Sequence, residues 1–91
     1  MPGKTIREKI AAGATIVDVR SMAEFSKGAY PGAMHIPLHL LPARMSELPP
    51  KDAPLVLYCA SGARSAQGVR FLTQNGFTDV VNAGGLVDMP R

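Results

Sequence analysis

The chain has 91 residues, of which 46% are hydrophobic and 19% are charged, a balance typical of a globular protein rather than a disordered one. This length leaves no room for a second domain, so we expect one domain over residues 1–91. The net charge of +3 is mild and the Lys and Arg residues are scattered, which argues against nucleic acid as a partner and suits small anions at least as well.

The N-terminal residues MPGKTIREK have no apolar stretch behind the lysine, so no signal peptide is expected. No run in the chain approaches the roughly 20 apolar residues that span a bilayer, so no membrane partner is expected. We therefore predict a cytoplasmic protein, or a periplasmic one if a leader peptide has been removed.

Two helices of the first half begin with the capping-box pattern, in which Ser or Thr is followed three residues later by Glu. The pattern predicts helices over residues 5–13 and 21–28, each ended by a glycine. Between them, the β-branched run ATIVDV (14–19) predicts a strand that is covered on both faces. A Pro-Gly turn then leads into a brief strand over Ala33–Ile36.

The middle of the chain predicts a helix followed by the most apolar strand. Apolar residues recur at helical spacing over 38–48, but proline fits only the first turn of a helix. The helix is therefore expected to begin near Leu41, with Pro42 in its first turn. After the loop PPKDAP, the run LVLYC (55–59) is the most hydrophobic strand candidate and is expected to be central.

The last third predicts one helix and one strand. The run ARSAQGVRFLTQNG (63–76) predicts a helix with Asn75-Gly76 as its stop and three residues on its apolar side, Ala66, Val69 and Leu72. The run TDVVNAGG (78–85) predicts a last strand and a glycine turn. Strands separated by helical segments imply βαβ units, so the fold class is α/β with a parallel sheet.

The only cysteine, Cys59, ends the expected central strand, so an internal disulfide and a CxxC redox pair are both excluded. Ligands of open parallel sheets bind beyond the carboxyl ends of the strands. The next residues, ASGA, are small and lead into a helix, so the loop can point backbone N–H groups at the sulfur. The helix N-terminus and Arg64 both favour the thiolate, which is the nucleophilic form.

A cysteine at a strand end is most often a buried apolar filler, but Gly62, Arg64 and the helix that follows favour a nucleophile here. Neither His35 nor His39 is obviously placed to act as the base that a protease or acyltransferase needs. No His/Cys cluster has zinc spacing, so neither a metal nor a cofactor is expected. Two reactions of the Cys59 thiolate therefore stay open. It can attack a sulfane sulfur to give a persulfide, or it can attack a phosphoryl group.

Five segments spread along most of the chain are IVDVRSMAEFSKG, PGAMHIP, VLYCASGARS, FLTQNGF and VNAGGL. In this order they resemble the single-domain rhodaneses, which are thiosulfate sulfurtransferases. The ending NAGGLVDMP is especially similar to the phage-shock-protein-E type of rhodanese. The resemblance implies a rhodanese-like small parallel sheet of four to five strands with helices on both faces.

The resemblance also implies a function and a site. Cys59 would take the outer sulfur of thiosulfate or of another sulfane-sulfur donor, and pass it as a persulfide to cyanide, a thiol or a thioredoxin-like acceptor. Backbone N–H groups of the loop would stabilise the persulfide, and Arg64 would pair with the sulfonate of thiosulfate. The residues expected to bind substrate are Ala60, Ser61, Gly62, Ala63, Arg64 and Ser65.

The length of this loop helps to separate the two chemistries. Cys59 to Arg64 inclusive is six residues, the size that the resemblance associates with sulfur transfer, whereas related dual-specificity phosphatases use one residue more. Two alternatives remain beside the enzyme: a sulfur-carrier or protein-interaction module, and a small cysteine-dependent phosphatase or arsenate reductase. Ala29, Tyr30 and His35 depart from the family pattern, which bears on the donor and acceptor rather than on the nucleophile.

Several neighbours of the loop are expected to have structural roles. We expect Arg20 to pair with Glu24, Asp18 to accept hydrogen bonds from nearby backbone, and His35 to be a packing residue. Ser65 is expected either to cap its helix or to donate its hydroxyl to the pocket. The glycine turn at 84–85 is expected to be tight and can lie beside the mouth of the active site in this fold.

Overall fold

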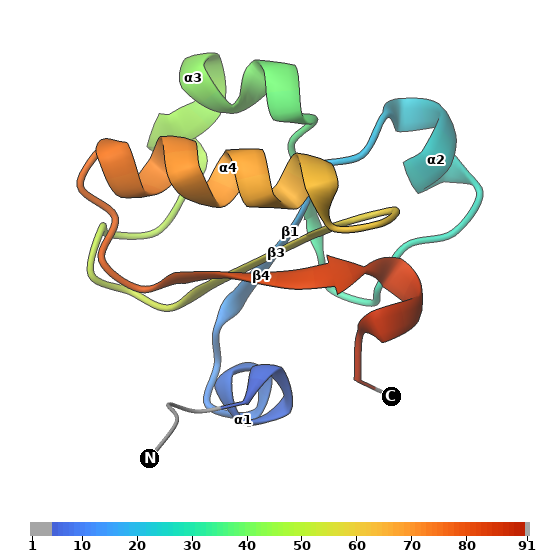
Figure 1. Ribbon diagram of the computed structural model, residues 1–91, viewed down its shortest axis with the longest axis horizontal. Helices are drawn as coiled ribbons and strands as arrows, with labels where there is room; N and C mark the ends of the chain where they lie inside the picture. The colour runs from blue at the N-terminus through green and yellow to red at the C-terminus, as the bar shows by residue number, and fades with distance from the viewer. Residues whose placement is uncertain (1–4, 91) are drawn as a thin grey trace.

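Four parallel strands form the sheet at the centre of the molecule (Figure 1). The computed structural model describes residues 5–90. The strands lie in the order β2-β1-β3-β4, so β3 is flanked on both sides as predicted. Their bounds are Thr15–Asp18 for β1, Met34–His35 for β2, Leu55–Cys59 for β3 and Val80–Gly85 for β4.

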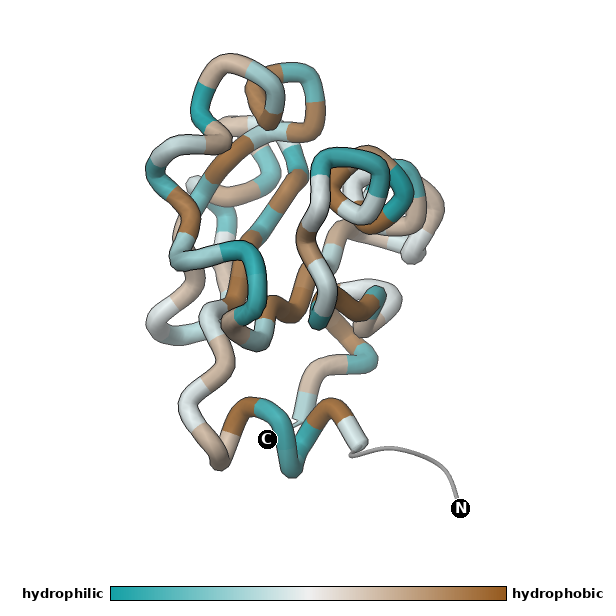
Figure 2. The backbone as a smooth tube through the Cα atoms, turned by 90° about the vertical axis from the view of Figure 1, so that its left-hand side faces the viewer, coloured by the Kyte–Doolittle hydropathy of each residue, from teal (hydrophilic) through white to brown (hydrophobic). Residues whose placement is uncertain are grey.

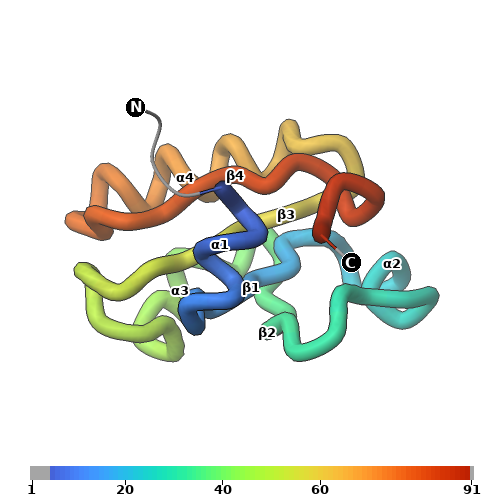
Figure 3. Tube along the Cα trace, turned by 90° about the horizontal axis from the view of Figure 1, so that it is seen from below, coloured from blue at the N-terminus to red at the C-terminus, as the bar shows by residue number. Residues whose placement is uncertain are grey.

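Helices cover both faces of this sheet. Helix α1 crosses one face, whereas α3 and α4 lie on the other, as Figure 1 and Figure 3 show from two directions. The helices run over Ile6–Ala11 for α1, Met22–Ser26 for α2, Leu41–Arg44 for α3 and Ala63–Gln74 for α4. The α/β class and the two-sided arrangement are therefore confirmed. Within residues 5–90, no helix has both the length and the apolar character that crossing a membrane requires.

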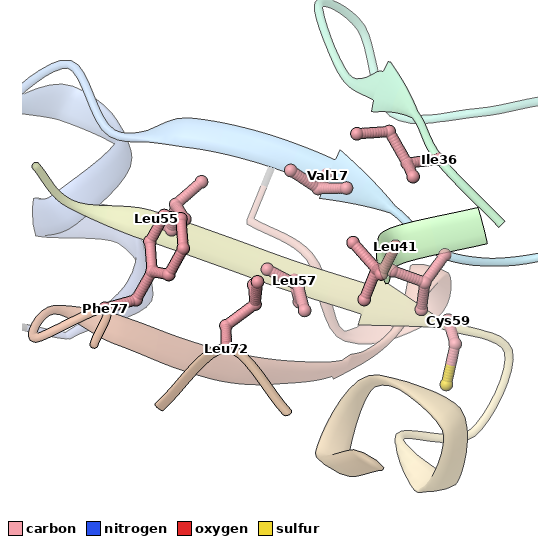
Figure 4. Close-up of a cluster of buried hydrophobic side chains, with 9 residues drawn as sticks. Val17, Ile36, Leu41, Leu55, Leu57, Cys59, Leu72 and Phe77 are labelled. Atoms are coloured by element: carbon pink, nitrogen blue, oxygen red, sulfur yellow. The ribbon is translucent and has the colours of Figure 1, made fainter. Parts of the chain in front are cut away.

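The alternation of side chains along β3 builds a core on each face of the sheet. Leu55, Leu57 and Cys59 pack with residues of α3 and α4 (Figure 4), whereas Tyr58 packs on the opposite face with Ile16 and Met89. All five residues of β3 are buried. Figure 2 shows apolar stretches of the backbone lying along the strands in the middle of the molecule. Both faces of the sheet are thus covered, as the run of apolar residues predicted.

Local sequence signals fix the starts of three helices. Thr5 and Ser21 each accept a hydrogen bond from the N–H group three residues on, and the Glu there accepts one in return. Both predicted capping boxes are therefore confirmed, each worth about 1 kcal/mol by analogy with measured caps. Helix α3 begins at Leu41 with Pro42 in its first turn, also as predicted, and is extended at both ends by short 3₁₀ turns.

The buried face of α4 agrees with the prediction only in part, because Leu72 is buried and Val69 packs against the core, but the helix also buries two small residues. Ser65, Gly68 and Leu72 are buried, whereas Ala66 is only partly so. The helix approaches the sheet so closely that a Cβ at Gly68 would lie 2.8 Å from Leu57 Cδ2. A helix at this distance must turn small residues toward the strand, so its contact is centred on the glycine rather than on Val69.

A buried polar cluster lies where β1 ends. Asp18 is fully buried, and its carboxylate accepts hydrogen bonds from the Arg20 N–H, the Arg20 guanidinium and the Tyr58 hydroxyl. The predicted acceptance from nearby backbone is confirmed, but the predicted Arg20–Glu24 pair is wrong. Arg20 is buried with Asp18, because a charge removed from water needs a partner at the same depth. Glu24 instead pairs with Arg64.

Candidate active site

The thiol of Cys59 lies at the carboxyl end of β3, directed toward the start of α4 (Figure 4). The residue has no exposed surface. Three groups can donate hydrogen bonds to Sγ: the Gly62 N–H at 2.9 Å, the Ser65 N–H at 3.4 Å and the Ser65 hydroxyl at 3.3 Å. The sulfur therefore lies in a nest of donors at a helix N-terminus, an arrangement that stabilises negative charge.

Glycine at three positions lets the loop close over the sulfur. Gly62 is the N-cap of α4 and has φ of +99°, a left-handed conformation that points its N–H at Sγ. A Cβ at Gly62 would also lie 3.2 Å from the Cα of Gly84. A side chain at Gly85 would overlap the carbonyl of Ala60. The end of β4 thus packs directly against the loop, which agrees with the place expected for the glycine turn.

The surroundings of Cys59 lower the pKa of its thiol. Burial alone would raise this pKa, but hydrogen bonds from Ser65, Ser61 and Gly62 outweigh burial and lower it from 9.0 to about 7. A thiol with a pKa near 7 is half ionised at neutral pH, so the nucleophilic thiolate is present without a neighbouring base. The thiolate is stabilised chiefly by the loop itself.

Ser65 is the third residue of α4, not its cap, because Gly62 occupies the cap position. Its hydroxyl oxygen lies 2.6 Å from Asn82 Oδ1, 3.2 Å from the Gly62 carbonyl and 3.3 Å from Cys59 Sγ. The hydroxyl has one hydrogen for these three acceptors, and Asn82 is the nearest. Asn82 thus competes with Cys59 for the Ser65 hydrogen.

Asn82 also braces the loop, a role that the sequence did not reveal. Its Nδ2 donates to the Gly62 carbonyl at 3.0 Å, and its Oδ1 accepts from the Gly84 N–H at 2.9 Å. The first bond links β4 to the N-cap of α4, and the second holds the Asn82 side chain against its own strand. The signal that could have found it is its place in β4, the strand that pairs with β3, three residues before the strand ends.

We expect Asn82→Asp to raise the pKa of Cys59 from about 7 toward the ordinary 9.0. The new carboxylate holds the Ser65 hydrogen more firmly and adds a negative charge beside the thiolate. The pH dependence of iodoacetamide alkylation measures the change, with a midpoint near 7 for the unaltered protein and a higher midpoint for the variant. Asn75→Asp, at the far end of α4, adds the same charge and should leave the midpoint unchanged. An unchanged midpoint in Asn82→Asp would contradict this role.

The side chains of the other loop residues make no hydrogen bond to the sulfur in the described structure. Ala60, Ser61 and Ala63 are exposed, so their side chains face solvent at the mouth of the loop. The Arg64 guanidinium donates to both carboxylate oxygens of Glu24, at 2.7 and 2.9 Å. Of the six predicted loop residues, Ser61, Gly62 and Ser65 are the ones whose polar groups stabilise the thiolate.

Neither histidine is bonded to Cys59 in the described residues, although His39 lines a pocket together with Ser21 and Arg64. The His35 ring stacks on Phe25 at 4.3 Å between centroids, and its Nε2 lies 2.8 Å from the Arg20 carbonyl. His35 is therefore a packing residue, as predicted, and His39 is exposed. Across the part of the chain that the structure describes, His, Cys, Asp and Glu form no group of three or more that could hold a metal ion.

Three kinds of comparison relate this chain to known proteins. Residues 3–88 match the family model of the rhodanese-like domain. The chain is 47% identical to a sulfurtransferase of Allochromatium vinosum over 84% of its own length and 71% of that protein. It is 36% identical to the thiosulfate sulfurtransferase PspE of Escherichia coli, over 82% of this chain and 75% of that protein.

The fold agrees with these relationships. A solved structure of a rhodanese from E. coli with anions superposes with a TM-score of 0.75 at 34% identity, covering 86% of this chain and 95% of that one. The match of the family model extends over nearly the whole described chain, including β3, the loop and α4. Sequence, sheet topology and the loop around Cys59 together place this chain in the rhodanese-like family of sulfurtransferases.

Proposed function

We propose that this protein transfers sulfane sulfur from thiosulfate or a persulfide donor to a thiophilic acceptor, with Cys59 as the nucleophile. The observation that supports the proposal is the environment of the Cys59 sulfur, which lies among N–H donors. These donors hold the pKa of the thiol at about 7. Such a thiolate can attack without a base, and the same donors suit the terminal sulfur of a persulfide, which is also an anion. The residues proposed to bind the donor are those of the loop, Ala60 to Ser65.

The reaction has two balanced steps. The Cys59 thiolate attacks the outer sulfur of thiosulfate, a new S–S bond forms, and the S–S bond of the donor breaks so that sulfite leaves with the electron pair. The outer sulfur of the resulting persulfide is then attacked by cyanide or a thiol. Thiocyanate or a new persulfide leaves, and the Cys59 thiolate is regenerated. No proton has to be supplied in either step, which fits a thiol whose hydrogen-bond partners are Gly62 and Ser65 rather than a histidine.

Phosphoryl transfer is the alternative that the loop supports less well. A phosphatase protonates its leaving group with a carboxylic acid, and the loop from Ala60 to Ser65 contains neither Asp nor Glu. The carboxylates of Asp18 and Glu24 are each engaged by an arginine. Hydrogen bonds lower the pKa of both, because Arg20 and Tyr58 donate to Asp18, against the opposing effect of burial, and Arg64 and Ser21 donate to Glu24. Neither is therefore protonated at neutral pH.

Turnover with thiosulfate and cyanide tests the proposal. We expect equal amounts of thiocyanate and sulfite to form, with a rate that rises with pH and levels off above about 7 as the thiol ionises. Hydrolysis of an aryl phosphate, run in parallel, should not be detected. Phosphate release without thiocyanate would reject sulfur transfer in favour of the alternative.

A further inference from the structure

The guanidinium of Arg64 is bound to a carboxylate rather than aimed at the sulfur. Nη1 and Nη2 donate to Oε1 and Oε2 of Glu24, a two-pronged contact that links the first turn of α4 to α2. Both side chains are about one-third exposed, at 36% and 34%. Figure 1 and Figure 3 place α2 at the same end of the sheet as the loop that leads into α4. This pair therefore lies at the rim of the site.

The carboxylate of Glu24 is also held in place by the N-terminus of its own helix, α2. Its Oε1 accepts hydrogen bonds from the Ser21 N–H and the Ser21 hydroxyl, both at 3.0 Å, as part of the capping box of α2. The bonds from Arg64 and Ser21 also hold the pKa of Glu24 well below its usual range, so it is an anion at neutral pH. A carboxylate held in place by its own helix is a preorganised partner for Arg64.

The consequence concerns the charge of the substrate. Thiosulfate is a dianion, and a sulfonate that made the same two-pronged contact with Nη1 and Nη2 of Arg64 would take the place of Glu24 there. The donors that face Cys59 Sγ come from Gly62 and Ser65, and these serve a terminal sulfur whatever group carries it. The carboxylate of Glu24 thus opposes dianionic donors while leaving the persulfide nest intact.

We propose that Glu24 is a specificity-determining residue that holds Arg64 and disfavours sulfonate-bearing sulfur donors. This inference rests on the proposed sulfur transfer through Cys59. It assigns the preferred donor to the class of thiol-bound persulfides, whose outer sulfur enters the nest without requiring the guanidinium. Thiosulfate then binds with reduced affinity, because a sulfonate that occupies Nη1 and Nη2 of Arg64 breaks the Glu24–Arg64 pair.

Glu24→Gln is the informative substitution, because glutamine preserves the capping box and loses the charge. Glu47→Gln is its matched control. Glu47 also accepts a two-pronged contact from an arginine, from Nε and Nη2 of Arg44 at 2.9 and 2.8 Å. Glu47 ends the 3₁₀ turn that follows α3, and Figure 3 shows α3 and α2 on opposite sides of the molecule. Each variant removes one carboxylate from an exposed ion pair, so a difference between them reports the position of Glu24.

The first measurement does not depend on sulfur transfer. Iodoacetate and iodoacetamide alkylate a thiolate by the same displacement of iodide, and they differ in one negative charge. Access to the buried sulfur largely cancels in the ratio of their rate constants. We expect Glu24→Gln to raise the ratio of iodoacetate to iodoacetamide roughly fivefold, the size of a unit-charge effect near a protein surface, and Glu47→Gln to leave it unchanged.

The second measurement is turnover of thiosulfate with cyanide. We expect Glu24→Gln to lower KM for thiosulfate roughly fivefold with little change in kcat, because the contact is made on binding. In an Arg64→Gln background the same substitution should have a much smaller effect. An equal effect in both backgrounds would overturn the proposal, because Glu24 would then act as a bare charge rather than through Arg64.

The two measurements separate the two claims. If neither thiosulfate nor a small-molecule persulfide gives turnover in any variant, the proposed reaction fails, and the alkylation ratio alone decides whether Glu24 controls anion access. If turnover is present but neither the ratio nor KM responds to Glu24→Gln, the specificity role fails and the reaction stands.

Discussion

Cys59→Ser is expected to abolish sulfur transfer while the fold persists. A serine hydroxyl is not ionised near neutral pH and cannot form a persulfide, so thiocyanate production should fall by a factor of about 10³ or more. Serine is close to cysteine in volume, and its oxygen can accept hydrogen bonds from the N–H groups of Gly62 and Ser65. The cost in stability should therefore stay within about 1–2 kcal/mol. A coupled assay for thiocyanate and a urea titration measure the two quantities.

No other thiol can replace the nucleophile in Cys59→Ser, because Cys59 is the only cysteine in the chain. Glu47→Gln, prepared in parallel, should retain full turnover. Turnover by Cys59→Ser within tenfold of the unaltered protein would show that sulfur passes through another group. The proposed nucleophile would then be wrong even if thiocyanate is formed.

Asp18→Ala is expected to have the largest effect on stability. Asp18 is fully buried, and its removal leaves the nearly buried Arg20 guanidinium without a counter-charge and the Tyr58 hydroxyl without its acceptor. Breaking a buried ion pair in this way costs about 3–5 kcal/mol, a large share of the roughly 5–15 kcal/mol that stabilises a domain. Urea unfolding at neutral pH measures the loss.

Two further variants keep this prediction decisive if Asp18→Ala does not fold. Tyr58→Phe removes one hydrogen bond to Asp18 and one from the Tyr30 N–H, so it should fold and lose about 1–3 kcal/mol. Asp79→Ala breaks the more exposed pair with Lys9 and should cost less than about 1 kcal/mol. Equal losses in Asp18→Ala and Asp79→Ala would contradict a special role for the buried cluster.

Features that depend on local sequence were predictable. The capping boxes at Thr5 and Ser21, and the place of Pro42 in the first turn of α3, follow from residues within one helical turn of each other. The position of Cys59 at the end of the central strand follows from the run of apolar residues and the small residues after it. These signals were enough to predict the sheet and the loop.

Features that depend on tertiary contacts could not be predicted from the sequence. Glu24 lies four residues from Arg20 in sequence, so a local pairing was predicted, but the fold brings it to Arg64, 40 residues away. Arg20 is buried in its ion pair with Asp18 and is therefore not available to pair with Glu24. Asn82 gives no local signal either, because its partners Gly62 and Ser65 reach it only when β4 lies beside β3.

Intact-mass analysis after incubation with thiosulfate alone tests the central claim most directly. We predict that the protein gains the mass of one sulfur atom, that peptide mapping places this sulfur on Cys59, and that cyanide removes it with release of thiocyanate. The Cys59→Ser variant should gain nothing. A protein whose mass stays unchanged under a hundredfold excess of both thiosulfate and a small-molecule persulfide would contradict sulfur transfer through Cys59.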